Sequence, residues 1–173
     1  MKSVFDTMSK NTGDAATFVD IGAADGYAML LAMLYGYRKS YGIEYSSTDG
    51  LKYIYDHLWQ KISSLHAGIF KQKWSPKQPR LDFGSGIAQS SLNGTKLHVF
   101  SFWDGFTAKD SEALLSKLRN ATNIERICLV RRASRQYGTF AKLQTELPKA
   151  VKIKELEVIY EKGRFNATIF KFT

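Results

Sequence analysis

The chain has 173 residues, and its hydrophobic share of 44% with mixed charge suits one globular domain and excludes an intrinsically disordered chain. Its 25 lysines and arginines exceed its 16 acidic residues, and the resulting net charge of +9 favours a polyanionic partner such as nucleic acid. No apolar run reaches the roughly 18–20 residues of a membrane span, and the charged N-terminal stretch argues against a signal peptide.

Short β-rich runs alternate with helical patterns from residue 17 onward. A strand is predicted over residues 17–21, a helix that is apolar nearly all round over 27–35, and a second strand over 40–45. An amphipathic helix follows, because its apolar residues recur at spacings of three and four: Leu51, Ile54, Tyr55, Leu58, Ile62 and Leu65.

The second half continues the alternation after a basic loop at 71–80 that contains two prolines. Asp110 is predicted to cap a helix that carries Leu114, Leu115 and Leu118. The remaining strands are predicted at 80–83, 97–102, 124–130, 151–160 and 164–172, the last two forming a hairpin. Together these elements predict a single domain over residues 1–173 with a Rossmann-like, doubly wound α/β fold. Its seven-strand sheet is mostly parallel and ends in an antiparallel hairpin.

The first strand runs into a turn of small residues. Asp20 lies in the strand, and Gly22 and Gly26 permit a tight turn into the next helix, while small residues let the backbone approach a ligand. Glu44 ends the second strand, 19 residues after Asp25. In dinucleotide folds a carboxylate about 20 residues on accepts the ribose hydroxyls. The turn and the acid together predict a nucleoside-containing cofactor.

Two alternatives share this architecture. An NAD domain is disfavoured because the Gly-x-Gly-x-x-Gly pattern is absent and Asp25 would crowd a pyrophosphate. The other is a structural turn in a domain that has lost its cofactor. A second glycine pattern at residues 81–86 is followed by Asp104 at about the right distance, but too little chain remains for a sheet with its own site. It is interpreted as the third strand and its loop.

The stretch at 18–26, with Glu44, resembles the cofactor signature of class I, seven-strand methyltransferases, and the resemblance covers most of the chain. It implies S-adenosyl-L-methionine as the cofactor. Ala24 stands at the usual middle glycine, and Ser85 stands where many relatives carry an acid for the adenine. The cofactor-binding residues that the resemblance implies are Asp20, Gly22, Ala23, Ala24, Asp25, Gly26, Glu44, Tyr45 and Ser85.

In this family the substrate is met after the fourth strand, at residues 100–106. The Asp/Asn-Pro-Pro-aromatic turn of amino-methylating enzymes is missing there, and the single Cys128 disfavours cysteine-mediated carbon-5 methylation. The stretches 18–22, 39–44 and 101–106 are closest in pattern to non-SET protein-lysine methyltransferases of the telomeric-silencing-disruptor type. The catalytic residues so implied are Ser101, Phe102, Trp103 and Asp104.

An aromatic channel would lower the pKa of an acceptor lysine by desolvating it. Phe102, Trp103 and Phe106 are expected to form that channel, Trp103 is expected to be exposed, and Asp104 would orient the amine. Tyr137 is a further candidate for the wall of the channel.

The resemblance thus implies methylation of lysine, and the net charge favours an acceptor on a basic or nucleic-acid-associated protein. The alternatives are an RNA methyltransferase, or a non-catalytic protein of this fold that binds nucleic acid or a partner subunit. Contacts to a polyanion are expected at Lys71, Lys73, Lys77, Arg80, Arg131, Arg132 and Arg135.

The cysteine and histidines are interpreted as structural. Cys128 is expected in the core, and a lone cysteine suggests a reducing, intracellular compartment, cytoplasm or nucleus. His57, His66 and His98 lack metal-ligand spacing and are expected on the surface or in packing.

Overall fold

A computed structural model describes residues 1–10, 15–44, 49–69, 80–83, 92, 94–132, 145–147, 149–160 and 163–173. Its seven-stranded sheet has the order β3-β2-β1-β4-β5-β7-β6. The strands are β1 (Thr17–Ile21), β2 (Lys39–Glu44), β3 (Arg80–Phe83), β4 (Leu97–Phe102), β5 (Ile124–Arg132), β6 (Ala150–Tyr160) and β7 (Gly163–Phe172). The first five are parallel, and β7 runs antiparallel to both β5 and β6. The predicted fold class is confirmed.

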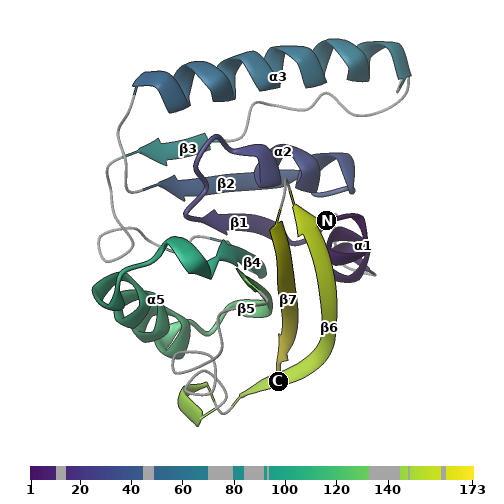
Figure 1. Cartoon of the computed structure of the whole chain (residues 1–173). Coiled ribbons are helices and arrows are strands. Elements are labelled where there is room, and N and C mark those ends of the chain that lie inside the picture. Colours follow the sequence, from purple (N-terminus) through teal and green to yellow (C-terminus); the bar gives the residue numbers. More distant parts are fainter. Residues whose placement is uncertain are drawn as a thin grey trace.

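The helices are α1 (Lys2–Ser9), α2 (Tyr27–Leu34), α3 (Asp49–Ile69) and α5 (Ala108–Asn120), with a short 3-10 helix η1 (Trp103–Gly105). They cover the two faces of the sheet (Figure 1). Because side chains alternate along a strand, Val99 of β4 packs in the cluster that contains α5, and Phe100 packs in the cluster that contains α1 and α2. Tyr55 joins α3 to α2 in a third cluster.

Helix α1 was not predicted. It lacks a side-chain N-cap and acidic residues in its first turn, so the usual local start signals are missing. Its burial comes from tertiary contacts: Phe5 is fully buried, and the Arg126 guanidinium of β5 donates to the carbonyls of Thr7, Met8 and Lys10. These bonds satisfy carbonyls at the helix C-terminus that have no partner within the helix.

The start of α5 also needs a correction. Its N-cap is Thr107, and Asp110 is the third helical residue. The Asp110 backbone N–H donates to Thr107 Oγ1 at 3.2 Å, and the Thr107 backbone N–H donates to Asp110 Oδ2 at 3.3 Å. Asp110 therefore completes a capping box instead of capping alone.

Buried polar groups in the centre of the sheet are structural, as predicted for Cys128 and His98. Cys128 is fully buried, and burial raises the pKa of its thiol. Tyr37 Oη and His98 Nδ1 share a buried hydrogen bond of 2.5 Å. Burial, followed by the nearby positive charge of Arg126, lowers the pKa of His98 to about 3, so the ring is neutral at pH 7. Within the described ranges, no helix is both long and apolar enough to cross a membrane.

Candidate cofactor and acceptor site

The site is placed by the order of the strands. Strand β1 has β2 on one side and β4 on the other, so the direction in which strands are added reverses between β1 and β4. Ligands of open α/β sheets bind at such a switch point, outside the carboxyl ends of the strands. The turn at residues 22–26 follows β1, Glu44 ends β2, and η1 follows β4. The fold therefore brings the predicted cofactor turn and acceptor turn to one edge of the sheet.

The glycines of the first turn are required by backbone conformation and by close packing. Gly22 and Gly26 have φ values of +77° and +76°, which only glycine adopts without strain. A methyl group built at Gly22 would lie 2.9 Å from Phe106 Cε1, and one at Gly26 would overlap the Tyr55 ring. Two rings thus press on the turn. Neither contact was predicted from the sequence, where nothing pairs an aromatic residue of α3 with Gly26.

Glu44 contacts the turn directly. The Ala24 backbone N–H donates to Glu44 Oε2 at 2.6 Å. Ala24 has a φ of +45°, a left-handed conformation that costs a non-glycine residue about 1–2 kcal/mol. This charge-assisted hydrogen bond offsets that strain where the family signature has a glycine.

Three carboxylates converge on this turn. Asp20 is only 3% exposed, and burial, then Glu44, then Asp25, raise the pKa of its carboxyl well above the usual range. Asp25 Oδ1 accepts a hydrogen bond of 3.1 Å from the backbone N–H of Tyr27, at the start of α2. The mutual repulsion of these groups favours a ligand that brings positive charge.

Of the residues predicted to be catalytic, Ser101 and Trp103 are buried, and Phe102 and Asp104 are half-buried. Ser101 is fully buried, and its Oγ donates to the carbonyl of Ile21 at 2.8 Å, which ties β4 to the end of β1. Phe102 belongs to the cluster on the α1 side, where its ring centroid lies 5.4 Å from that of Tyr160 and 5.5 Å from that of Phe165.

Trp103 is 7% exposed, so the prediction that its side chain is exposed was wrong. It packs in the cluster of α5 and meets Phe106 with ring centroids 5.9 Å apart. Exposure was expected because the neighbouring residue, Asp104, is charged. That carboxylate has its own partners, since Oδ2 accepts from the Arg132 backbone N–H at 2.9 Å and lies 3.6 Å from Arg132 Nε. Asp104 therefore fixes the end of β5 against η1.

The candidate polyanion contacts are placed in part. Arg131 and Arg132 end β5 at the same edge of the sheet as the turn at residues 22–26. Arg80 begins β3, at the opposite end of that strand. The predicted residues Tyr45, Lys71, Lys73, Lys77, Ser85, Arg135 and Tyr137 lie outside the described residues.

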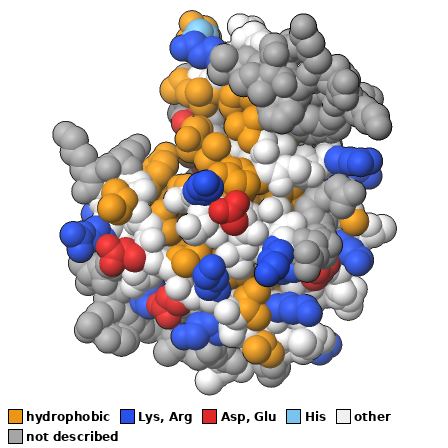
Figure 2. All heavy atoms as spheres, turned by 90° about the vertical axis from the view of Figure 1, so that its right-hand side faces the viewer, with side chains coloured by type: hydrophobic (Ala, Val, Ile, Leu, Met, Phe, Trp, Pro, Cys, Tyr) orange, Lys and Arg blue, Asp and Glu red, His pale blue; other side chains and the backbone are white. Residues whose placement is uncertain are grey.

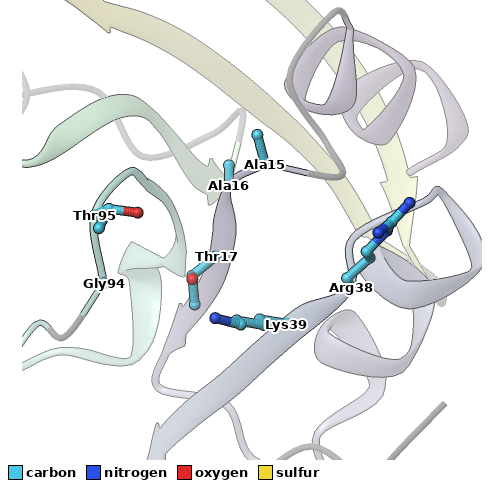
Figure 3. A pocket seen from close by; sticks show the side chains of 7 residues that line it. All are labelled: Ala15, Ala16, Thr17, Arg38, Lys39, Gly94 and Thr95. Atoms are coloured by element: carbon cyan, nitrogen blue, oxygen red, sulfur yellow. The ribbon is translucent and has the colours of Figure 1, made fainter.

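A pocket of about 600 Å³ lies elsewhere (Figure 3). Its lining includes Thr17 and Lys39, the first residues of β1 and β2, together with Arg38, Gly94 and Thr95. The Lys39 side chain points toward Thr17, whereas Arg38 points away from it (Figure 3). Since these are the amino ends of the parallel strands, the pocket is separate from the cofactor turn. Among the described residues, no group of three or more His, Cys, Asp and Glu side chains could hold a metal ion.

No protein-family model matches the sequence, and no curated protein matches it significantly. Solved structures do match its fold. The magnesium protoporphyrin IX methyltransferase ChlM of Synechocystis PCC 6803, with bound S-adenosylmethionine, is 12% identical with a TM-score of 0.67, over 98% of this chain and 77% of that one.

Two further matching structures are proteins provisionally assigned as methyltransferases of RNA. One, from Pyrococcus horikoshii, is provisionally assigned as an RNA methyltransferase. It is 10% identical to this chain with a TM-score of 0.67, and the match covers 98% of this chain and 82% of that one. The other, from Streptococcus pneumoniae, is assigned as a tRNA methyltransferase, with 14% identity and a TM-score of 0.61 over 99% and 70% of the two chains. The chain thus has the Rossmann-like fold of class I methyltransferases.

Proposed function

We propose that the protein is an S-adenosylmethionine-dependent methyltransferase whose acceptor is RNA. The observation that carries the first part is the hydrogen bond between Glu44 and Ala24 at the switch point. It joins the two halves of the cofactor signature, which lie on different strands. The buried carboxyl of Asp20, with Glu44 and Asp25 nearby, fits a ligand that brings a positively charged group.

In this proposal Glu44 accepts hydrogen bonds from the ribose hydroxyls, and the small residues at 22–24 pack against the methionine part. Asp20 and Asp25 provide negative potential for the ammonium and sulfonium charges. The bound cofactor would supply a methyl group on a positively charged sulfur. An acceptor nucleophile would attack that methyl carbon in line while the carbon–sulfur bond breaks, and the neutral thioether would leave. Positioning contributes most of such a rate enhancement. Phe106 packs on Gly22 and so lies between the cofactor turn and η1.

The acceptor is assigned from charge and packing. The net charge is +9, and Arg131 and Arg132 end β5 at the edge of the sheet that holds the turn. Two matching structures carry RNA assignments. A lysine acceptor would require the aromatic channel expected after β4, but Trp103 is buried and Phe102 packs in the α1-side cluster. These observations favour RNA over lysine.

Transfer of labelled methyl groups from S-adenosylmethionine to a whole-cell extract tests both parts. Ribonuclease should release the label and protease should leave it, and the Glu44→Ala variant should transfer little. Label that protease removes would reassign the acceptor to protein. If neither the RNA nor the protein of the extract is labelled and calorimetry finds no cofactor binding, the chain is a non-catalytic protein of this fold.

A further inference from the structure

The pocket at the amino ends of β1 and β2 is too far from the cofactor turn to be part of it. Thr17 and Lys39 are in register on neighbouring parallel strands, so their side chains leave the same face of the sheet. The turn begins after Ile21, at the other end of β1 and roughly 13 Å from Thr17 at about 3.3 Å per residue. A group bound in the pocket would therefore not touch a methyl group held at that turn.

Three polar side chains converge on the pocket. The Lys39 ammonium points toward Thr17, and the Thr95 hydroxyl is directed toward the same space from the other side (Figure 3). Within the described part of the chain, none of these three side chains has a hydrogen bond or an ion pair. The described lining also contains no acidic side chain that could neutralise Lys39. Because an oxoanion accepts hydrogen bonds from an ammonium and from hydroxyls, these donors favour an anionic ligand.

Gly94 keeps the pocket open. A methyl group built on it would lie 3.2 Å from Thr17 Oγ1 and 2.6 Å from Leu97 Cδ2, so a side chain at this position would fill the space over Thr17. Two hydrogen bonds hold the loop in place. Asn123 Nδ2 donates to the Gly94 carbonyl at 2.7 Å, and the Thr17 backbone N–H donates to the Lys96 carbonyl at 2.9 Å. This wall of the pocket is thus fixed before a ligand arrives, which lowers the entropic cost of binding.

The surroundings of the pocket are basic. Arg38 and Lys96 adjoin Lys39 and Thr95 in the sequence, and both are exposed. Strands β1 and β2 begin on the right-hand side of Figure 1, which is the side that Figure 2 shows, and basic side chains are spread over it among hydrophobic and acidic ones. Together with the net charge of +9, these side chains attract anions to this side of the molecule.

We propose that this pocket binds a phosphate group, with the Lys39 ammonium and the Thr17 and Thr95 hydroxyls as donors. Its volume of about 600 Å³ lies within the usual range of ligand pockets, roughly 300–1,000 Å³, so the phosphate can belong to a larger molecule. Two sources have this chemistry, a backbone phosphate of RNA and a small phosphorylated molecule. The site itself does not depend on the proposed function, and only the RNA source is connected with it.

Calorimetric titration of the chain with inorganic phosphate, at low ionic strength and without cofactor, tests the site. The wild type should bind phosphate with a millimolar dissociation constant. Lys39→Gln should raise that constant about ten-fold, because the charge-assisted hydrogen bond is lost. Thr17→Val, which removes the hydroxyl and keeps a branched side chain, should raise it about three-fold.

Lys52→Gln is the matched control. It removes one positive charge at an exposed position on α3 and should bind phosphate as the wild type does. Circular dichroism shows whether each variant is folded. The proposal is overturned if the wild type binds no phosphate at about 10 mM, ten times a millimolar dissociation constant. Equal phosphate binding by Lys39→Gln and Lys52→Gln would overturn it too.

Fluorescence anisotropy with a labelled single-stranded oligoribonucleotide separates the two sources. If RNA supplies the phosphate, Lys39→Gln should weaken RNA binding and reduce the slope of log K against log salt by about 0.7, the value for one phosphate of a single strand. If Lys39→Gln loses inorganic phosphate but keeps its affinity for RNA, the ligand is a small phosphorylated molecule. A chain that transfers no methyl group to RNA would contradict the proposed function and leave the result of the phosphate titration unchanged.

Discussion

Replacing Glu44 by alanine should weaken the binding of S-adenosylmethionine by about 1–3 kcal/mol, or roughly 5- to 150-fold. Two losses contribute. The first is the charged acceptor for the ligand hydroxyls, because hydrogen bonds to an ionised group are among the stronger ones. The second is the 2.6 Å bond from the Ala24 N–H, which holds that residue at a φ of +45°. Without it, the turn is expected to relax away from the geometry that the ligand requires.

A second substitution separates the two losses. In the Glu44→Ala background, Ala24→Gly should recover about 0.5–1 kcal/mol, because glycine adopts a positive φ without the cost that alanine bears. Glu44→Gln should bind better than Glu44→Ala, since the amide oxygen can still accept from the Ala24 N–H. The recovered part measures the conformational contribution, and the remainder measures the contact with the ligand.

Isothermal titration calorimetry of each variant with S-adenosylmethionine gives the required free energies, and thermal unfolding shows that each variant is folded. Glu112→Ala is the control, because Glu112 is an exposed glutamate on α5 that pairs with Arg119. Wild-type affinity in Glu44→Ala would refute the cofactor assignment. If Ala24→Gly recovered nothing in the Glu44→Ala background, the strain argument would be wrong.

Three further predictions concern stability and are checked by urea denaturation. Asp20→Asn should make the ligand-free protein more stable at pH 7 and weaken cofactor binding, because it removes a buried carboxylate that two others repel. The pKa of His98 is about 3 in the folded protein, against 6.5 in the unfolded chain. Between these two pH values His98 is protonated in the unfolded chain and neutral in the folded protein. Acidification within this window should therefore cost up to ~1.4 kcal/mol per pH unit, a dependence that His98→Asn reduces. Trp103→Ala should cost about 3–5 kcal/mol as a buried ring is lost, whereas Asp104→Asn, which keeps an acceptor for the Arg132 N–H, should cost about 1 kcal/mol or less. Equal destabilisation by these two variants would contradict the different burial of their side chains.

Most of the sheet was predictable because each strand carries a local signal. The run at Thr17–Ile21 is β-rich and ends in glycine, and the hairpin of β6 and β7 has turn residues between two alternating runs. Helix α1 has no comparable signal. Its place depends on Arg126, which lies more than 115 residues away in the sequence, and no local pattern reports such a contact.

The conformation of the turn at residues 22–26 was predictable for a similar reason, since Gly22 and Gly26 stand where the backbone needs a positive φ. The exposure of residues 101–106 was not predictable, because it depends on tertiary contacts with residues that are distant in the sequence. The charge of Asp104 suggested a turn in solvent and thus an exposed Trp103. Instead, the backbone N–H of Arg132 satisfies that carboxylate, and the neighbouring indole packs inward. A charged residue beside an aromatic one therefore predicts exposure only when the charge lacks a protein partner.

The contacts between the two turns link the segments that follow β1 and β4 mechanically. The Ser101 hydroxyl donates to Ile21 at the end of β1, and Phe106 packs on Gly22 immediately afterwards. The first contact joins β4 to the last residue of β1. The second joins the segment after β4 to the turn after β1. Packed groups of this kind do not shift independently, because a close-packed interior leaves little free volume. A ligand that shifts residues 22–26 should therefore also shift Phe106 and, through the ring contact with Trp103, η1. Ligand binding at residues 22–26 and the positioning of an acceptor that meets η1 would then be coupled without any separate lid.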